Sequence, residues 1–399
     1  MKIVQFGLAH SPNVGDGVIA ECLLHGIRLC RPEARVQTVD ISGRAAPGDR
    51  PVPARGVALR LLPLLPPPIR RALVRRRLTR LLDRVEPQWQ SALAGADLAV
   101  VGGGQLFSDA DLNFCLKLAR VAALLRGAGV PVAVHAAGAS RNWSVQGTAL
   151  FMELFGTDLR RVGLRDAASL AAWRDQTGGA PPAPVLARDP GLLAARLYPP
   201  APPTGRVAIC VTAPQILRYH ADADADAAVA ARGLDFYARL ADRLLYAGER
   251  VTLFCNGAWE DRQALARLAG GGQLSGAVAA GCVQVAPPPG TPADLAAVVS
   301  GARAVVAHRL HACILAHAYA VPAVGLGWDR KVESFFAAVG QGDRFMPGPF
   351  HAPDDVARAL GMAAAAGGDR AAAEAEADAA LNDIRLMLAE NWAPARGAA

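Results

Sequence analysis

Short apolar runs alternate with amphipathic, helix-like segments along most of the chain. An apolar run at residues 2–8 is followed by a polar turn at 13–16 and then by apolar positions at helical spacing over 17–30. The same alternation continues with apolar runs at 36–41, 98–101, 130–136, 159–164 and 185–187, and helical patterns at 111–127 and 167–175. Short apolar runs separated by helix-length segments predict the strands of a parallel sheet, each followed by a helix.

A second set of the same pattern follows a proline-rich segment. Residues 198–205 read YPPAPPTG, with four prolines and one glycine, and predict a linker. Beyond it the alternation resumes at residues 207–211, 233–247, 251–255, 283–285, 295–299, 304–307 and 321–326, and an alanine-rich helical pattern covers 353–392. The sequence therefore predicts an α/β protein with two doubly wound, Rossmann-like domains facing a cleft, and a C-terminal helix that packs back.

The predicted domain boundaries follow from these patterns. The N-terminal domain is expected to cover residues 1–197, with a basic insertion at 44–86, and the linker 198–205. The C-terminal domain is expected to cover 206–350, followed by helices and a tail at 351–399. Ligands of such sheets bind at the carboxyl ends of the strands.

Composition places the chain among globular proteins. Apolar residues make up 52% of its 399 residues and charged residues 19%, which excludes a disordered polymer. No apolar run is long enough to cross a bilayer, and residues 2–6 already read as a strand rather than as a signal peptide. The seven cysteines are scattered singly, which favours buried thiols in a reducing compartment. A cytoplasmic protein is expected.

Positive charge is concentrated in one segment. Between Arg44 and Arg84 there are eleven arginines and two aspartates, an excess of nine positive charges in a chain whose net charge is +7. Helices are expected near residues 68–85 and 88–93. This segment could contact an anionic membrane at the inner face of the cell envelope, or a polyanionic glycan, or form an ordinary solvated surface. Nucleic acid is not expected as a partner, because no aromatic residues are interleaved with the basic ones.

Candidate chemistry is densest where the apolar run at 302–307 ends. His308, Arg309 and His311 follow that run directly, and an apolar helix comes after them. The three-residue spacing would place both imidazoles on one side of the first helical turn. A guanidinium between apolar runs needs an anionic partner, and an imidazole can exchange protons near neutral pH. Zinc is not expected, because no third ligand is nearby.

Other polar groups also follow predicted strands. Asn13, Gly15 and Asp16 either cap a helix or bind a ligand. Residues 102–104 are three glycines, which either offer backbone N–H groups to a ligand or make a tight turn. They match neither a dinucleotide fingerprint nor a P-loop. Arg165 with Asp166 is either a ligand contact or a cap with an ion pair, and Asp329 and Lys331 follow the run at 321–326.

These motifs together resemble a known family. The triplet Arg309-Leu310-His311, opening a helix after a buried strand, resembles the signature of the polysaccharide pyruvyl transferases. Agreement in order and spacing extends over residues 1–340, through Asn13-Val14-Gly15-Asp16, Ala96-Asp97 before the glycines, Arg165-Asp166 with Ser169, and Asp189-Pro190. One departure is that Ala307-His308 stands where the family usually has Gly-Met. The resemblance also implies the two-domain arrangement of GT-B glycosyltransferases.

The resemblance implies transfer of a pyruvyl group from phosphoenolpyruvate to a sugar of a cell-surface polysaccharide or its lipid-linked precursor, without a cofactor or metal. Arg309 would grip the carboxylate or phosphate, and His311 would donate or accept a proton. Lys331 and Asp329 match the end of the signature, and Lys331 would be a second anion contact. His308 would either touch phosphate or only fill space.

The resemblance also divides the two domains by role. Gly103, Gly104, Arg165 and Asp16 would belong to the N-terminal, acceptor-binding domain, and Asp16 would bind an acceptor hydroxyl or act as a base. The C-terminal domain would bind phosphoenolpyruvate. Two other functions remain open on the same fold: a nucleotide-sugar glycosyltransferase, and a non-catalytic glycan-binding protein.

Overall fold

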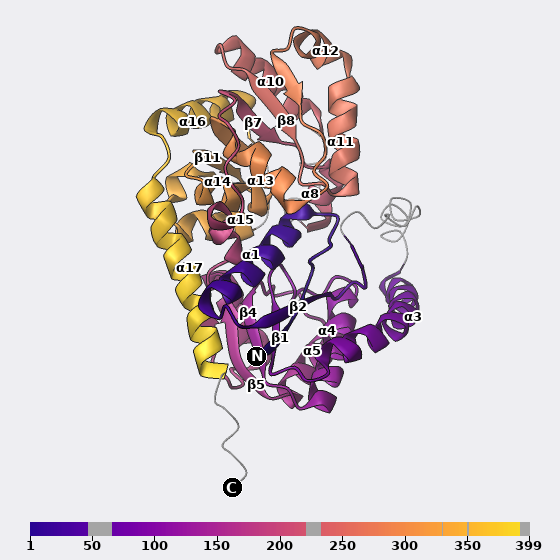
Figure 1. The fold of residues 1–399 in the computed structure, drawn as a ribbon. Coiled ribbons are helices and arrows are strands. Elements are labelled where there is room, and N and C mark those ends of the chain that lie inside the picture. The colour runs from indigo at the N-terminus through magenta and orange to yellow at the C-terminus, as the bar shows by residue number, and fades with distance from the viewer. Residues whose placement is uncertain (47–65, 221–232, 329, 349–350, 392–399) are drawn as a thin grey trace. The chain divides into compact units, whose positions relative to one another are not determined.

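The chain divides into two compact units. The computed structural model describes residues 1–46, 66–220, 233–328, 330–348 and 351–391 (Figure 1). Unit 1 comprises Met1–Ser11, Ile19–Pro190 and Asp378–Ala399, and unit 2 comprises Pro12–Val18 and Gly191–Ala377. The division therefore falls inside two helices, α1 (Val14–Cys30) and α17 (Arg370–Asn391).

Unit 1 is built on a six-stranded parallel sheet. Its strands are β1 (Lys2–Gly7), β2 (Arg35–Asp40), β3 (Leu98–Gly102), β4 (Val132–Ala137), β5 (Leu159–Leu164) and β6 (Val185–Leu186). They lie in the order β2-β1-β3-β4-β5-β6, so the order reverses between β1 and β3. The central strands β3 and β4 are buried throughout because helices cover both faces of the sheet.

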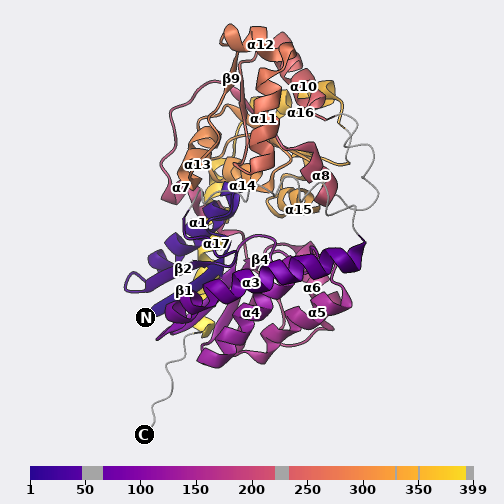
Figure 2. The ribbon, with the colours of Figure 1, turned by 90° about the vertical axis from the view of Figure 1, so that its right-hand side faces the viewer.

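The helices of unit 1 follow its strands. They are the larger part of α1, α3 (Pro67–Leu93), α4 (Asn113–Ala128), α5 (Val145–Met152), α6 (Ala167–Thr177) and the end of α17. An aromatic cluster of Phe107, Trp143, Phe151 and Trp173 fills the core on one face of the sheet. On that face α3 lies along α4 (Figure 2).

The two helices expected in the basic insertion are a single helix, and the predicted break is wrong. Helix α3 continues through Pro87. Val85 and Trp89 on either side are both buried in the core of unit 1, while Pro87 itself is exposed. The carbonyl that loses its partner to proline is therefore on the solvated side, and packing outweighs one missing hydrogen bond. Residues 47–65 of the insertion lie outside the described residues.

Unit 2 has a second six-stranded parallel sheet. Its strands are β7 (Val207–Cys210), β8 (Val251–Phe254), β9 (Val283–Val285), β10 (Ala304–Ala307), β11 (Ala323–Leu326) and β12 (Phe345–Met346). Their order is β12-β11-β10-β7-β8-β9, with the reversal between β7 and β10. This is the strand order of dinucleotide-binding Rossmann domains, whose ligands lie at the reversal.

Helices alternate with these strands. They are α7 (Ala194–Leu197), α8 (Pro214–His220), α10 (Asp235–Tyr246), α11 (Trp259–Gly270), α12 (Gly272–Ala279), α13 (Pro292–Ser300), α14 (Leu310–Ala318), α15 (Arg330–Ala338) and α16 (Pro353–Ala366), with the first part of α17. The prediction of two doubly wound, Rossmann-like domains is confirmed. None of the described helices combines the length and the apolar character needed to cross a membrane.

The segment expected as a linker belongs to unit 2. In residues 198–205, the Ala201 N–H donates to Ser300 Oγ at 3.0 Å and the Thr204 N–H to the Gly301 carbonyl at 2.8 Å. The division by contacts falls earlier, between Pro190 and Gly191. Proline removes strand hydrogen bonds but does not prevent an extended segment from lying against a helix end.

The C-terminal helix packs back on unit 1, as predicted. Near its end, Arg161 of β5 is paired with Glu390. Earlier in the same helix, Asp383 accepts the Arg188 N–H at 2.8 Å. The alanine-rich stretch forms two helices, α16 and α17, because the glycine pair at residues 367–368 separates them.

Candidate active site

Three neighbouring strands of unit 2 end in one row and carry the densest polar cluster. Ala307 of β10 lies beside Cys210 of β7, which lies beside Phe254 of β8. The segments that follow these strands contain His308 and Arg309, Thr212 and Ala213, and Asn256 to Asp261. This row is at the reversal of strand order, where α/β sheets bind ligands.

Arg309 is held by a carboxylate of its own unit. Its Nε and Nη2 atoms both donate to Asp261 Oδ2, at 3.0 and 2.6 Å. The other oxygen of Asp261 accepts the Ala213 N–H at 2.8 Å, so this buried carboxylate joins the ends of β10 and β7. Burial opposes the charge on the guanidinium, but the carboxylate outweighs it and raises the pKa of Arg309. The guanidinium is therefore charged, while burial, opposed by Arg309, raises the pKa of the Asp261 carboxyl.

The Arg309 side chain is 12% exposed, and no described residue forms a hydrogen bond with its Nη1 atom. Arg309 also stands at the start of α14, as its N-cap residue. A guanidinium with one edge fixed by a carboxylate and another edge available can bind an anion without first being ordered. The anionic partner expected for this arginine is Asp261, a residue that the sequence patterns did not indicate.

His308 is enclosed by aromatic side chains. Its Nδ1 atom lies 3.0 Å from the Tyr237 hydroxyl, which also accepts the Thr212 N–H at 3.1 Å. Since the hydroxyl already accepts that N–H, its own proton is best placed on His308 Nδ1, leaving the imidazole protonated at Nε2. Burial, with smaller effects of His351 and Arg309, lowers the pKa of His308 to about 3. The ring is therefore neutral at ordinary pH.

This arrangement differs from the prediction for the two histidines. Helix α14 begins at Leu310, so His308 precedes the helix, and the two imidazoles do not share a helical turn. The His308 carbonyl accepts the Trp328 indole N–H, and Lys331 Nζ lies 5.3 Å from the centre of the Trp328 ring. Lys331 is thereby placed near the end of β10. Asp329 lies outside the described residues.

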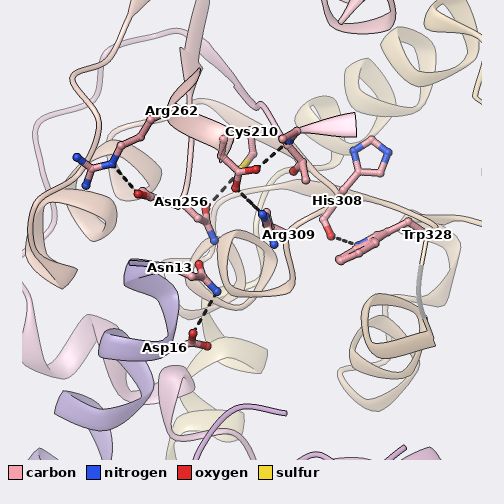
Figure 3. A network of polar contacts seen from close by, with 12 residues as sticks. Asn13, Asp16, Cys210, Asn256, Arg262, His308, Arg309 and Trp328 are labelled. Atoms are coloured by element: carbon pink, nitrogen blue, oxygen red, sulfur yellow. Dashed lines mark hydrogen bonds and ion pairs between the residues drawn. The ribbon is translucent and has the colours of Figure 1, made fainter. Parts of the chain in front are cut away.

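His311 lies against the beginning of α1. Its Nδ1 atom is 3.9 Å from Asp16 Oδ1, and the two side chains are 11% and 14% exposed. A Cβ atom added at Gly15 would lie 2.5 Å from the Cβ of His311, closer than real Cβ atoms approach one another. Gly15 therefore permits the contact. Asn13 Nδ2 donates to Asp16 Oδ2 at 3.4 Å (Figure 3).

The loop after β8 fastens this N-terminal segment to unit 2. The Val14 N–H donates to the Asn256 carbonyl at 2.8 Å. Gly257 has a φ of +90°, and a Cβ there would lie 2.7 Å from Val14 Cγ2. The Asn256 side chain is buried, with Oδ1 accepting the Cys210 thiol at 3.4 Å. In Figure 3 the ends of the Asn256 and Arg309 side chains point toward Asn13.

The remaining predicted residues gather at strand ends of unit 1. Gly103 and Gly104 have φ values of +77° and +75°, and the turn they form follows β3. Arg165 follows β5; its Nη2 donates to Gln105 Oε1 at 2.5 Å and its Nε to Asp166 Oδ2 at 3.2 Å. Asp166 Oδ1 accepts the Ser169 N–H at 2.6 Å and caps α6. The helix cap by Asp166 and the ion pair between Arg165 and Asp166 are therefore both present.

The predicted site residues thus fall into two groups. Unit 2 brings together Asn13, Gly15, Asp16 and His311, and it links His308, next to Arg309, through Trp328 to Lys331. Unit 1 brings together Gly103, Gly104 and Arg165. That the two groups line one cleft stays a prediction.

The residues that sequence reasoning missed are Asp261, Tyr237 and Asn256. The signal for Asp261 was the Glu260-Asp261 pair at the start of a helix after β8. Both carboxylates are buried. Among the described residues no group of three or more histidine, cysteine, aspartate or glutamate side chains could hold a metal ion.

The fold and the cluster define a doubly wound α/β protein with a cation-bearing site at its strand ends. The sequence profile of the polysaccharide pyruvyl transferases matches residues 13–330, most of the chain. The chain therefore belongs to this family of transferases, as its motifs indicated. No curated protein sequence matches it at a significant level.

Solved structures with similar folds include a variant of the Thermobaculum terrenum O-GlcNAc transferase, at 16% identity and a TM-score of 0.45, covering 98% of this chain and 66% of that chain. The spinosyn rhamnosyltransferase has 15% identity and a TM-score of 0.48, covering 98% and 99%. A putative UDP-N-acetylglucosamine 2-epimerase from Listeria monocytogenes has 11% identity and a TM-score of 0.45, covering 94% and 93%. These similarities are too distant to indicate a substrate.

Proposed function

We propose that the protein transfers the pyruvyl group of phosphoenolpyruvate to two hydroxyls of one sugar, in a cell-surface polysaccharide or its lipid-linked precursor. The observation that carries this proposal is the cluster of Arg309, His311 and Asp16 within the segment matched by the family profile. It offers a fixed cation, an imidazole and a carboxylate within one unit. We propose a cytoplasmic location for the reaction, where phosphoenolpyruvate is available.

The chemistry requires these three groups. A proton is added to the methylene carbon of phosphoenolpyruvate, and the neighbouring carbon becomes oxocarbenium-like. One sugar hydroxyl attacks this carbon and loses its proton, phosphate leaves, and the second hydroxyl closes the ring with loss of its own proton. The products are a pyruvate ketal and inorganic phosphate. A site for this reaction needs cations for the carboxylate and phosphate, a proton donor and a proton acceptor.

The roles follow from the surroundings of each side chain. Arg309 binds the carboxylate or phosphate of the donor through the edge not used by Asp261, and Lys331 is a second cation for it. His311 donates the proton, because His308 is neutral and enclosed by Tyr237. Asp16, beside His311, accepts the proton of the attacking hydroxyl. No cofactor or metal is needed for these steps.

Unit 1 supplies the acceptor side in this proposal. The backbone turn of Gly103 and Gly104 and the Arg165 side chain offer donors to sugar hydroxyls. Asp16 is grouped with unit 2, so the proposal places Asp16 and His311 together at the reacting atoms.

The decisive experiment measures release of inorganic phosphate from phosphoenolpyruvate with a panel of lipid-linked and free saccharides. We expect phosphate release to depend on one acceptor. The product should be heavier than that acceptor by the pyruvyl group added as a ketal. Thermal stabilisation by phosphoenolpyruvate, compared with UDP- and GDP-sugars, provides the second arm. Stabilisation by a nucleotide sugar alone, without acceptor-dependent phosphate release, would contradict the proposal.

A further inference from the structure

Helix α3 has one buried face and one exposed, basic face. Leu78, Leu82, Val85 and Trp89 are buried in the core of unit 1, and each follows the last by three or four residues. They therefore form one stripe along the helix. On the opposite side lie six residues at the same spacing, here called the basic face of α3: Ile69, Leu73, Arg76, Arg77, Arg80 and Arg84.

The four arginines of the basic face have no carboxylate partner among the described residues. Each is exposed, and none forms an ion pair with any described residue. Both acids of α3 are bonded elsewhere, since Asp83 and Glu86 pair with Arg120 of α4. By contrast, nearby Arg70 bonds to Asp111 at 2.7 Å. The positive charge of the basic face is therefore compensated by nothing in the described chain.

Two aliphatic side chains extend the same face. Ile69 is 52% exposed and Leu73 is 48% exposed. Ile69, Leu73 and Arg77 follow one another every four residues, beside a second row of Arg76, Arg80 and Arg84; each row spans about 12 Å of helix. Binding a soluble polyanion would require only the arginines of this face. An anionic lipid surface needs both the arginines and the aliphatic residues, because phosphates pair with the guanidiniums while aliphatic groups enter the boundary of the acyl chains.

We propose that the basic face of α3 binds the surface of a membrane containing anionic phospholipids. This goes beyond pyruvyl transfer and is independent of it: the face would place the protein where lipid-linked saccharides are found. Charge alone would assign every arginine of α3 to this face, but the structure does not. Arg70 is bonded to Asp111 and Arg71 is half-buried, so neither belongs to the face.

The first test uses vesicles of phosphatidylcholine with about one third phosphatidylglycerol, and full-length protein in a flotation assay. Wild type should bind these vesicles, fail to bind pure phosphatidylcholine, and release as salt is raised. Replacing Arg76, Arg77, Arg80 and Arg84 by Gln should weaken binding by about 100-fold or more, because each basic group near such a surface contributes roughly fivefold. Its unfolding midpoint should not change, since the side chains are exposed.

A matched control removes four other exposed arginines of unit 1, outside α3. These are Arg28, Arg35, Arg174 and Arg385, each replaced by Gln. The net charge changes equally, so a loss of binding equal to that of the α3 variant would show that only total charge matters, and would overturn the proposal. Salt-independent binding, or none to anionic vesicles, would also overturn it.

The second test separates lipid from a soluble polyanion. The double variant Ile69→Ser with Leu73→Ser should bind anionic vesicles about tenfold more weakly, because apolar contact is lost, while its binding to dextran sulfate stays unchanged. Equal vesicle binding by wild type and this variant would mean that the aliphatic residues make no contact, and the lipid surface would be the wrong partner. Phosphate release on a soluble acceptor should be unaffected in every variant.

Discussion

His308 and His311 come from the same junction of strand and helix, but their surroundings are opposite. His308 is buried, bonded to Tyr237, and holds a pKa of about 3. His311 keeps 11% of its side chain exposed and lies beside the Asp16 carboxylate. Arg309 stands between them in the chain and is fixed by Asp261. One imidazole thus serves the structure as a neutral ring, and the other is placed where it can exchange a proton.

The difference shows that spacing alone does not assign roles to neighbouring histidines. Burial removes the charged form of one ring, while a nearby carboxylate and partial exposure favour proton exchange at the other. Four changes would break or sharpen this contrast, and they are ordered by the size of the expected effect.

The largest effect is expected at His311. Replacing it by Gln should lower turnover about 10²–10⁴-fold, because it removes the proposed general acid, and should change phosphoenolpyruvate affinity little. Phosphate release and calorimetric binding measure the two quantities separately. The control is His308→Gln, which should retain most of the turnover. Equal losses of turnover in the two variants would mean that both imidazoles have the same role, and would contradict the difference between them.

Asp261→Asn should destabilise unit 2 by about 3–5 kcal/mol, because it leaves the Arg309 guanidinium buried without its counter-charge. Urea unfolding followed by fluorescence measures the change. The double variant with Arg309→Gln should recover much of the loss, since no uncompensated charge remains. If the losses of unfolding free energy in the two single variants simply add in the double variant, Asp261 and Arg309 do not stabilise each other, and the pair does not hold the segment between His308 and His311.

Gly15→Ala should cost about 1–3 kcal/mol, because the added methyl would meet His311 at the start of α1. The clash involves the Cβ of His311, so combining the change with His311→Ala should not relieve it, whereas His311→Gly should. Thermal unfolding measures all three. Gly127→Ala in α4 is the control: nothing lies within 4 Å of its added Cβ, and a slight stabilisation is expected. Full tolerance of Gly15→Ala would contradict the close contact.

The smallest effect concerns pH and His308. Its pKa is about 3 in the folded protein and about 6.5 when unfolded, so the unfolded state binds more protons between these values. The contribution of the neutral ring to the free energy of unfolding is complete above about pH 6.5 and is lost as pH falls toward 3. Between about pH 5.5 and 4.5, wild type should lose about 1 kcal/mol more stability than His308→Gln. Parallel pH profiles from urea titrations would contradict the neutral, buried ring.

The fold could be predicted from sequence because the signals that define it are local. The run at residues 304–307 is a buried strand, and the cationic residues after it lie at a strand end as expected. Local patterns failed at Pro87, where the buried contacts of Val85 and Trp89 continue a helix that proline alone would end.

The candidate site could be predicted only in part, because its partners are distant in sequence. Asp261 is 48 residues from Arg309, and Tyr237 is 71 residues from His308. The sequence required an anion near Arg309 but could not distinguish a ligand from a carboxylate of the chain. It also could not show that His308 precedes the helix and is closed in by aromatic rings.

The interleaving of the two units has a consequence for the order of synthesis. Unit 2 includes Pro12–Val18, which precede most of unit 1, and unit 1 includes residues from Asp378 onward, which follow all of unit 2. Asp16 leaves the ribosome long before His311. The contact between the two side chains can form only after the intervening residues have been synthesised. Neither unit is one contiguous stretch of the chain, so each is completed by residues that are synthesised after part of the other unit. Expression of residues 191–377 alone would yield a sheet that carries Arg309 and His311 but lacks Asp16.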